Sequence, residues 1–488
     1  MDAVQRVMKN SAVLVAEKIA LSGLSIFVVS YVARSLGEVD YGKFAFAFGF
    51  VELFRILGDM GLWTLTVREV AKDRSIASAF LGHSLMIHSL LIVLTFLSIA
   101  VAVNLMGYSS DTRVLVYIAA FALVFELMAD CFRAIFQAFQ KMEYSALLRI
   151  IYGVFAGGFA ISVLYLGRGV LMVSSGYLMG NILIIGIAYW FVVKHFARPT
   201  FQIDFRVWKK MLRRSLPFAF QAFFILIAFK FDIVMLSKMK GDAEVGWYNV
   251  AANLTYKMLF IAVALSGSIY PAVSELLGTS IEKASKLVTR SLYFLLVLGL
   301  PLAVGGTLLG PQIILFLFGE RYLPSILVFQ VIVWFVPLCY TATLLSNVLV
   351  AMELQRLVVR TGAVKAGINI GLNAFLIPTF GAIGAAIATV VSEGFVALYY
   401  IPTVSKHFSF RRLRRKFTAL AISNACMAGF LLIPQVHQLH FSLEIAGGMV
   451  IYFGFMLLFR GLDKQDIIAV RNLLPYGGIY RRKVVFWS

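Results

Sequence analysis

Charged side chains lie inside one of the most apolar stretches of the chain, between residues 41 and 69. Glu52, Arg55 and Asp59 are spaced at i, i+3 and i+7, so on a helix they would share one face. An ionisable group at the centre of a bilayer costs about 2.5 to 17 kcal/mol, depending on the method, and therefore faces protein or a watery cavity. If this stretch crosses a membrane, its charged face lines such an interior.

Other apolar stretches carry the same kind of residue at helical spacing. Glu126, Asp130, Arg133 and Gln137 lie at i, i+4, i+7 and i+11, and Lys365, Asn369 and Asn373 lie at i, i+4 and i+8, so each set would share one face of a helix. The candidate cations are Lys18, Arg55, Arg133, Arg149, Lys230, Lys257 and Lys365. The candidate acids are Glu17, Glu52, Asp59, Glu126, Asp130, Asp232 and Glu393, and the amides expected to line a polar cavity are Asn253, Asn369 and Asn373. Such a set of cations would bind an anion, because Arg in particular binds phosphate through two parallel hydrogen bonds. The acids would bind a coupling ion, either a proton or a sodium ion, or form salt bridges that hold helices or close a gate, and both roles stay open.

The elements that position these residues must be membrane helices. Of the 488 residues 61% are hydrophobic and only 14% are charged, and the mean hydropathy of +0.88 excludes a soluble globular protein. A span needs about 20 mostly apolar residues. Fourteen such stretches lie near residues 10–33, 41–63, 78–106, 114–138, 144–166, 170–193, 215–237, 246–270, 288–310, 324–350, 357–378, 381–404, 416–434 and 441–459.

The net charge of +20 is unevenly distributed, and the distribution of Lys and Arg among the loops predicts the orientation of these spans. Most Lys and Arg residues fall in the loops on the side that an even number of spans gives to both termini, so we expect that side to be cytoplasmic. The densest basic clusters, Lys194–Arg214 and Lys406–Lys416, each lie between two spans. They are interpreted as solvated loops that touch anionic membrane lipids, not as a nucleic-acid site.

Motifs of catalysis are absent from the sequence. It contains no phosphate-binding loop of the P-loop type, no HExxH and no GxSxG. The three cysteines all fall within spans, so we expect neither a disulfide framework nor a metal site, and no cofactor. His83 and His88 are expected to pack or to lie at the membrane interface. The chain is therefore predicted to be a transporter and not an enzyme.

A faint internal repeat divides the spans into two sets. Residues 34–54 can be laid over residues 240–260 at a constant offset of 206, which pairs Tyr41 with Trp247 and Phe54 with Phe260. Each set holds six spans, so the two copies have the same orientation in the membrane, as in transporters with parallel repeats.

The predicted fold is therefore an all-α polytopic membrane protein of about 14 transmembrane helices. Two pseudo-symmetric six-helix lobes surround a central cavity, and two extra helices follow them. The expected boundaries are 1–195 for the N-lobe, 196–214 for a cytoplasmic basic linker, 215–405 for the C-lobe, 406–416 for a cytoplasmic basic loop, 417–460 for spans 13 and 14, and 461–488 for a cytoplasmic tail.

Four segments carry a family resemblance. NIGLNAFLIPTFGAIGAAIATVVSE (369–393) resembles the span 11 to 12 signature of the polysaccharide transporter family, the Wzx-type O-antigen and capsule flippases of the multidrug/oligosaccharidyl-lipid/polysaccharide exporter superfamily. LGEVDYGKFAFAFGFVELFRILGDMGLWTLTVREVAK (36–72) resembles the opening of that family, and FGERYLPS (318–325) and LLSNVLVAMELQRL (344–357) are also similar to it.

The resemblance implies a flippase that moves a polyprenyl-pyrophosphate-linked oligosaccharide from the inner to the outer face of the cytoplasmic membrane by alternating access. The cations named above would then form the family's basic cavity, and spans 13 and 14 a groove for the polyprenyl tail. The implied partners are the lipid-linked oligosaccharide, membrane lipids, a coupling ion and the polysaccharide polymerase machinery.

Two other hypotheses remain open at this stage. An ion-coupled exporter of drugs or small cations with the same fold would use Asp59, Glu126, Asp130 and Glu393, and the cations would be a liability. A membrane enzyme acting on lipid-linked glycans would need paired carboxylates in an external pocket, and the external loops are short.

Overall fold

The structure is a computed structural model that describes residues 3–408, 414–433, 436 and 441–462. The helices of its first half are α1 (Ala3–Leu53), α2 (Arg55–Asp59), α3 (Leu62–Lys72), η1 (Arg74–Ile76), α4 (Ala77–Leu105), α5 (Ser110–Ala138), α6 (Met142–Tyr165), α7 (Val170–His195), α8 (Phe205–Met239) and α9 (Asp242–Met258). The second half holds α10 (Phe260–Leu277), α11 (Ile281–Leu308), α12 (Gly310–Phe318), η2 (Glu320–Tyr322), α13 (Ser325–Ile332), α14 (Phe335–Ala351), α15 (Gln355–Ser405), α16 (Arg414–Leu431) and α17 (Phe441–Leu458). The described residues contain no strand, so the predicted all-α class is confirmed.

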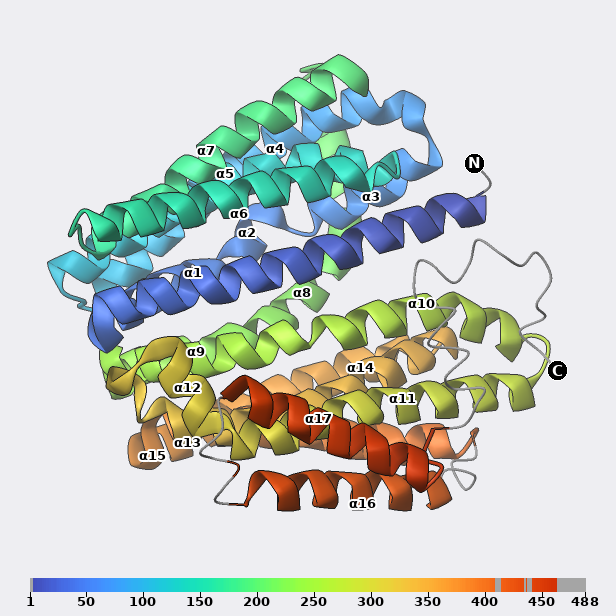
Figure 1. Cartoon of the computed structure of the whole chain (residues 1–488). Coiled ribbons are helices and arrows are strands. Elements are labelled where there is room, and N and C mark those ends of the chain that lie inside the picture. Colours follow the sequence, from blue (N-terminus) through green and yellow to red (C-terminus); the bar gives the residue numbers. More distant parts are fainter. Residues whose placement is uncertain (1–2, 409–413, 434–435, 437–440, 463–488) are drawn as a thin grey trace. The chain divides into compact units, whose positions relative to one another are not determined.

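The helices have the length and composition of membrane spans. Ten described helices are long and apolar enough to cross a bilayer, or eleven if the bent helix α8 is one span. Two of the ten, α1 and α15, are 51 residues long and kink at Gly37 and Gly381, so each joins two of the predicted spans. Figure 1 shows that α1 turns back on itself. The predicted fourteen spans are compatible with these helices, and the number stays a prediction.

One face of α4 shows the surface that lipid requires. Leu90, Val93, Leu97 and Val101 lie at i, i+3, i+7 and i+11, and each is more than half exposed. In a protein that dissolves in water such a stripe would be costly, whereas in a bilayer it meets acyl chains of equal polarity. The chain is a multi-pass membrane protein.

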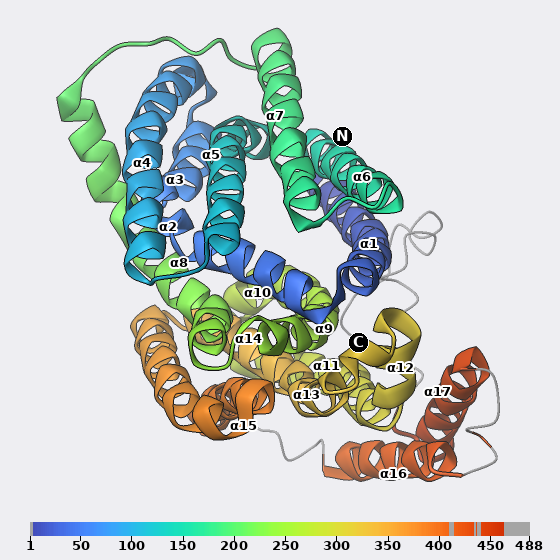
Figure 2. The ribbon, with the colours of Figure 1, turned by 90° about the vertical axis from the view of Figure 1, so that its left-hand side faces the viewer.

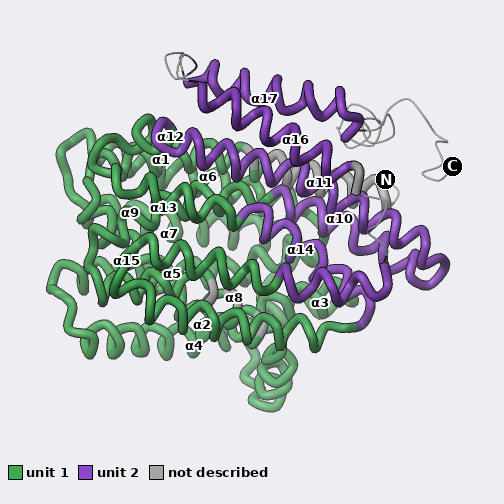
Figure 3. The backbone as a smooth tube through the Cα atoms, turned by 90° about the horizontal axis from the view of Figure 1, so that it is seen from below, with its two compact units in different colours: residues 1–260, 313–335, 354–396 green, residues 261–312, 336–353, 397–488 purple. Residues whose placement is uncertain are grey.

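The described residues group into two compact units, which Figure 3 colours separately. One comprises residues 1–260, 313–335 and 354–396, and the other residues 261–312, 336–353 and 397–488. The first unit contains α9 as well as α1 to α8, because α9 packs along α1. The boundaries of the two units differ from those of the two predicted lobes. The division into lobes stays a prediction.

The predicted linker and tail are described only in part. Residues 197–204 run without secondary structure between α7 and α8, as Figure 2 shows, and α8 begins within the predicted linker at Phe205. The backbone N–H of Thr200 donates to the carbonyl of Ser78, which ties this segment to α4. Residues 409–413 of the second basic loop and 463–488 of the tail lie outside the described residues.

The repeat is visible in the backbone where α1 crosses α9. Gly37 and Gly241 have nearly the same conformation, with φ of 76° and 92° and ψ of 173° and −175°, a region that only glycine enters readily. Five residues after each of these glycines, another glycine lies close to the backbone of the other copy. A Cβ on Gly42 would lie 1.7 Å from the carbonyl oxygen of Asp242, and a Cβ on Gly246 would lie 2.2 Å from that of Glu38.

This reciprocal contact defines the register of the two copies. The paired glycines are 204 residues apart, not the 206 of the sequence alignment, so that alignment is wrong by two positions at this crossing. The aromatic residues that suggested the offset of 206 are not the ones that hold the repeat, because the contact is made by main-chain atoms.

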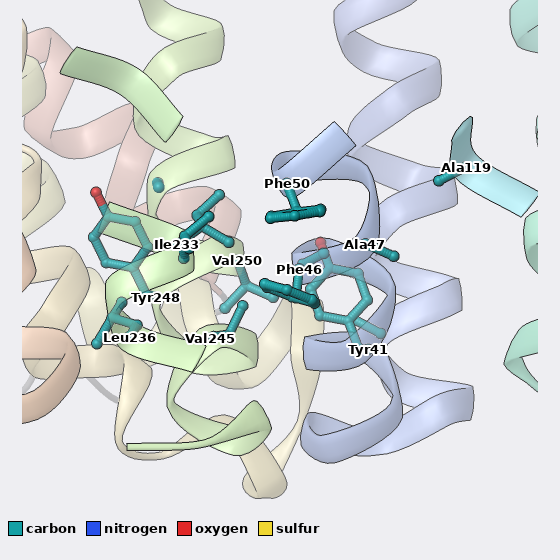
Figure 4. Packing of buried hydrophobic residues seen from close by; sticks show 14 of the residues in the cluster. Tyr41, Phe46, Ala47, Phe50, Ala119, Ile233, Leu236, Val245, Tyr248 and Val250 are labelled. Carbon is teal, nitrogen blue, oxygen red and sulfur yellow. The ribbon is translucent and has the colours of Figure 1, made fainter. Parts of the chain in front are cut away.

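A large apolar cluster surrounds the crossing within the first unit. Figure 4 shows Phe46 and Phe50 of α1 pointing toward Val245 and Val250 of α9, with Ile233 of α8 beside them. All five side chains are buried. The charged residues discussed below therefore lie on a scaffold of closely packed helices.

Candidate functional site

Arg55 is the centre of an ion-pair cluster in the first unit. Its Nε donates to Glu52 Oε1 at 2.7 Å, its Nη2 lies 2.5 Å from Glu126 Oε1, and its Nη1 donates to Asp130 Oδ2 at 3.0 Å. Arg133 contacts Asp130 and lies 3.9 Å from Glu126 Oε1. The predicted stripe of Glu126, Asp130 and Arg133 on one helix face is thus confirmed, and Arg55 joins it from α2.

Ion pairing also neutralises two other predicted cations. Arg149 of α6 contacts Glu17 of α1 through Nε at 2.7 Å and Nη2 at 3.0 Å, a two-pronged contact. Lys365 contacts Glu393 within α15, and its ammonium lies 5.3 Å from the Phe229 ring centroid. Both carboxylates are buried. Lys18, by contrast, is exposed.

The predicted amides belong to two buried networks. Asn253 Nδ2 donates to Asn249 Oδ1 at 2.6 Å, and the Tyr41 hydroxyl donates to the same oxygen at 2.9 Å across the helix crossing. On α15, Asn373 Nδ2 donates to Asn369 Oδ1 at 3.0 Å. Amides four residues apart are therefore hydrogen-bonded on one polar face of α9 and on one polar face of α15.

Asp232 forms hydrogen bonds and no salt bridge among the described residues. Its carboxylate accepts a hydrogen bond from the Tyr248 hydroxyl and one from the backbone N–H of Ile233 at 2.8 Å, and Thr389 lies beyond Tyr248 at 3.4 Å. Lys230, two residues earlier, has no carboxylate within salt-bridge distance in the part of the chain that the structure describes.

Lys257 bridges two helices without an acidic partner. Its Nζ donates to the Ser25 hydroxyl at 2.7 Å, which joins α9 to the first segment of α1. Among the described residues no carboxylate lies within salt-bridge distance of this half-buried ammonium. Of the predicted cations, it combines a position within the helix packing with a charge that no acid offsets.

Asp59 and His88 form a contact that the sequence did not predict. His88 Nε2 lies 3.6 Å from Asp59 Oδ1, and the imidazole is almost fully buried. Asp59 also accepts backbone hydrogen bonds from Gly61 and Trp63 at 3.0 Å. His88 is packed in the interior, as expected, and it gains this contact because α2 ends at Asp59 and the carboxylate then reaches α4.

Two protein-family models match the sequence of this chain. The model of the family described as "Polysaccharide biosynthesis protein" matches residues 7–277, more than half of the chain. The chain belongs to this family. A second family model, MatE, matches residues 217–375. The resemblance to the superfamily of multidrug, oligosaccharidyl-lipid and polysaccharide exporters is thereby confirmed.

Two curated relatives come from Haloferax volcanii. "Probable flippase AglR" is 29% identical over 266 residues, which is 52% of this chain and 53% of that protein, so the match spans about half the length of the relative. "Probable low-salt glycan biosynthesis flippase Agl15" is 21% identical over 469 residues and covers 93% of this chain and 96% of the relative.

Solved structures share the fold. The lipid II flippase MurJ in an inward closed conformation superposes with a TM-score of 0.74 at 17% identity, over 92% of this chain and 98% of that one. An inward-facing multidrug resistance transporter of the MATE family superposes with a TM-score of 0.66 at 17% identity, over 81% of this chain and 98% of that one. The chain therefore has the fold that MurJ and the MATE transporters share, and its division into two lobes stays a prediction.

Proposed function

We propose that this protein is a flippase that moves a polyprenyl-pyrophosphate-linked oligosaccharide from the inner to the outer leaflet of the cytoplasmic membrane by alternating access. The description of the two Haloferax volcanii relatives as flippases supports a role in glycan biosynthesis. The fold supports alternating access, because transporters of this fold have been captured in both inward-facing and outward-facing conformations. The glycan is a surface polysaccharide repeat unit such as O-antigen or capsule.

The observation that carries the proposal is the Lys257 ammonium. It lies on α9, within the predicted C-lobe, and reaches Ser25 of α1, within the predicted N-lobe. A pyrophosphate needs cationic donors that are not already neutralised, since displacing a carboxylate from a buried ion pair costs several kcal/mol. Lys257 meets that condition without any rearrangement of an acid.

The remaining cations divide by their contacts. Lys230 and Lys18 are proposed as further phosphate contacts, since neither forms a salt bridge among the described residues. Arg55, Arg133, Arg149 and Lys365 hold salt bridges in this conformation. They become phosphate contacts only in a conformation that opens those pairs, and until then they act as gates between helices.

Orientation follows from charge. The basic loops and both termini are proposed to face the cytoplasm, by the excess of Lys and Arg on that side. The lipid-linked substrate is built on the same side, so the pyrophosphate enters a site that is open toward its source. The polysaccharide polymerase machinery would receive the product on the opposite face.

Reconstitution tests the proposal. Purified protein in liposomes should move a fluorescent polyprenyl-pyrophosphate oligosaccharide between leaflets. Lys257→Met should raise the half-saturating substrate concentration about 10- to 150-fold, because a hydrogen bond to a charged group contributes about 1.5–3 kcal/mol. Lys257→Arg should restore most of the loss. Lys209→Met, which removes an exposed charge from the linker region, is the matched control.

Two outcomes would overturn parts of this assignment. Unchanged flipping by Lys257→Met, with folded protein at wild-type yield, would remove Lys257 from the anion path. Wild-type protein that moves a labelled organic cation but not the lipid pyrophosphate would favour the exporter of small cations. The three carboxylates around Arg55 are the observation that keeps this second function open.

A further inference from the structure

The His88 side chain has a hydrogen-bonding arrangement that is short of one proton. Its Nδ1 lies 2.8 Å from the carbonyl oxygen of Ser84, and a carbonyl can only accept, so Nδ1 must carry a hydrogen. In a neutral imidazole Nε2 is then bare. That bare nitrogen faces the Asp59 carboxylate at 3.6 Å, and a carboxylate too is an acceptor.

Two acceptors in contact inside a protein repel each other unless a proton lies between them. One added proton converts the contact into an imidazolium–carboxylate pair or a hydrogen bond to a protonated acid. The imidazole is almost fully buried, and the thiol of the neighbouring Cys131 of α5 donates to the carbonyl oxygen of Leu127 at 3.6 Å instead. The pair therefore has the composition of a site for a single exchangeable proton.

Other charged groups near the pair are already engaged. Asp130 of α5 lies behind Asp59 and contacts both Arg55 and Arg133. On α4 itself, His83 accepts a hydrogen bond from Trp208 of α8 at 3.2 Å. In the described part of α3 and α8 no Lys or Arg lies within salt-bridge distance of Asp59. No cation other than His88 is therefore placed to neutralise Asp59 directly.

Asp59 stands at a break in the backbone. Helix α2 has only five residues, and after it Met60 and Gly61 both adopt the left-handed conformation, with φ of 47° and 76°. The Asp59 carboxylate accepts the N–H groups of Gly61 and Trp63 and so holds the start of α3. A non-glycine residue at positive φ is uncommon and is kept only where neighbouring contacts enforce it. The carboxylate that faces His88 is thus one of the contacts that fix this joint.

We propose that His88 and Asp59 bind one proton and that the state of this proton sets the position of α2. The proton arrives from water as hydronium and returns to water, so no other reactant is needed. Because α2 carries Arg55 at one end and Asp59 at the other, loss of the proton repels the carboxylate from the imidazole and displaces Arg55 from its three carboxylates. Coupling to substrate rests on the proposed flippase function, and proton binding itself does not.

Nitrogen NMR tests proton binding without any substrate. The chain has six histidines, and protein labelled with ¹⁵N-histidine in liposomes should lose one signal pair in His88→Gln. That pair should report a protonated Nδ1 across the pH range and an Nε2 that gains a proton as pH falls. Asp59→Asn should remove the protonation of Nε2, whereas His83→Gln on the same helix should leave it unchanged. A neutral Nε2–H tautomer, or an Nε2 that never titrates, would overturn the proposal.

Flipping under a pH gradient tests coupling. In liposomes clamped at zero membrane potential, exchange of one proton for one substrate predicts an approximately tenfold accumulation of substrate per pH unit, because one unit is worth about 1.36 kcal/mol. His88→Gln and Asp59→Asn should flip substrate to equal leaflet concentrations, and His83→Gln should behave as wild type. Accumulation that survives in both pair variants would refute coupling at this site. Wild-type protein that flips nothing would refute the proposed function and leave the NMR result standing.

Discussion

Gly42→Ala is expected to destabilise the crossing of α1 and α9. The added Cβ would lie 1.7 Å from the Asp242 carbonyl oxygen, whereas such a carbon and oxygen normally approach to about 3.3 Å. The helices would have to separate by about 1.6 Å, the difference between these two distances. The obstacle is backbone, which cannot rotate away as a side chain can.

The cost can be estimated from two opposing terms. Overpacking a well-filled interior costs typically about 1–3 kcal/mol, and two rigid backbones place this case at the upper end. Replacing glycine by alanine within a helix gains about 0.5–1 kcal/mol. The net loss is therefore about 2 kcal/mol. Gly158→Ala is the matched control, because that helical glycine of α6 is exposed with open space around it and should only gain.

The assay can use the chain's own thiols. Cys131 and Cys339 carry buried thiols, so a thiol-reactive fluorophore in detergent reports the temperature at which they become accessible. Gly42→Ala should lower that midpoint by several degrees and Gly158→Ala should leave it unchanged or raise it. A Gly42→Ala midpoint equal to that of wild type would refute the close approach of the two backbones and with it the register of 204 residues.

Three further variants follow from buried contacts and can be measured by the same thermal assay. Lys365→Met should lower the free energy of unfolding by about 3–5 kcal/mol, because it leaves Glu393 buried without its partner. Replacing both residues by methionine should restore most of that loss. Equal effects of the single and double variants would contradict the ion pair. Tyr322→Phe removes a buried hydrogen bond of 3.0 Å to a carbonyl of α1 and should cost about 1 kcal/mol, and no change would place that hydroxyl in contact with water. Glu244→Ala should cost about 1–3 kcal/mol because it strips the acceptor from the N–H that follows Gly381, and Glu244→Gln, which keeps an oxygen there, should be milder.

Helical periodicity predicted the contacts that lie within single helices. The Glu126, Asp130 and Arg133 stripe and the Asn369 and Asn373 pair are found as expected, because their spacing alone determines that they share a face. The all-α membrane fold followed from composition for a similar reason, since a bilayer admits few ways to satisfy backbone groups.

Contacts between helices were beyond the reach of the sequence. Arg55 meets Asp130 75 residues away, and Lys257 meets Ser25 232 residues away. No local spacing encodes such pairs, since they depend on which helix faces which. The Asp59 contact of His88 was missed for a related reason. A lone histidine in an apolar helix looks like packing, and its partner became available only through the break after Asp59.

The contact between the glycines of α1 and α9 also explains why the repeat is so hard to see. The contact is made by carbonyl oxygens at two positions that lack a side chain, so it does not require the residues around those positions to be alike in the two copies. What the two halves still share is therefore two small residues five positions apart and a backbone shape. In transporters built on such a repeat, glycines at matching positions of a close helix contact are therefore a better sign of the repeat than matching polar or aromatic residues.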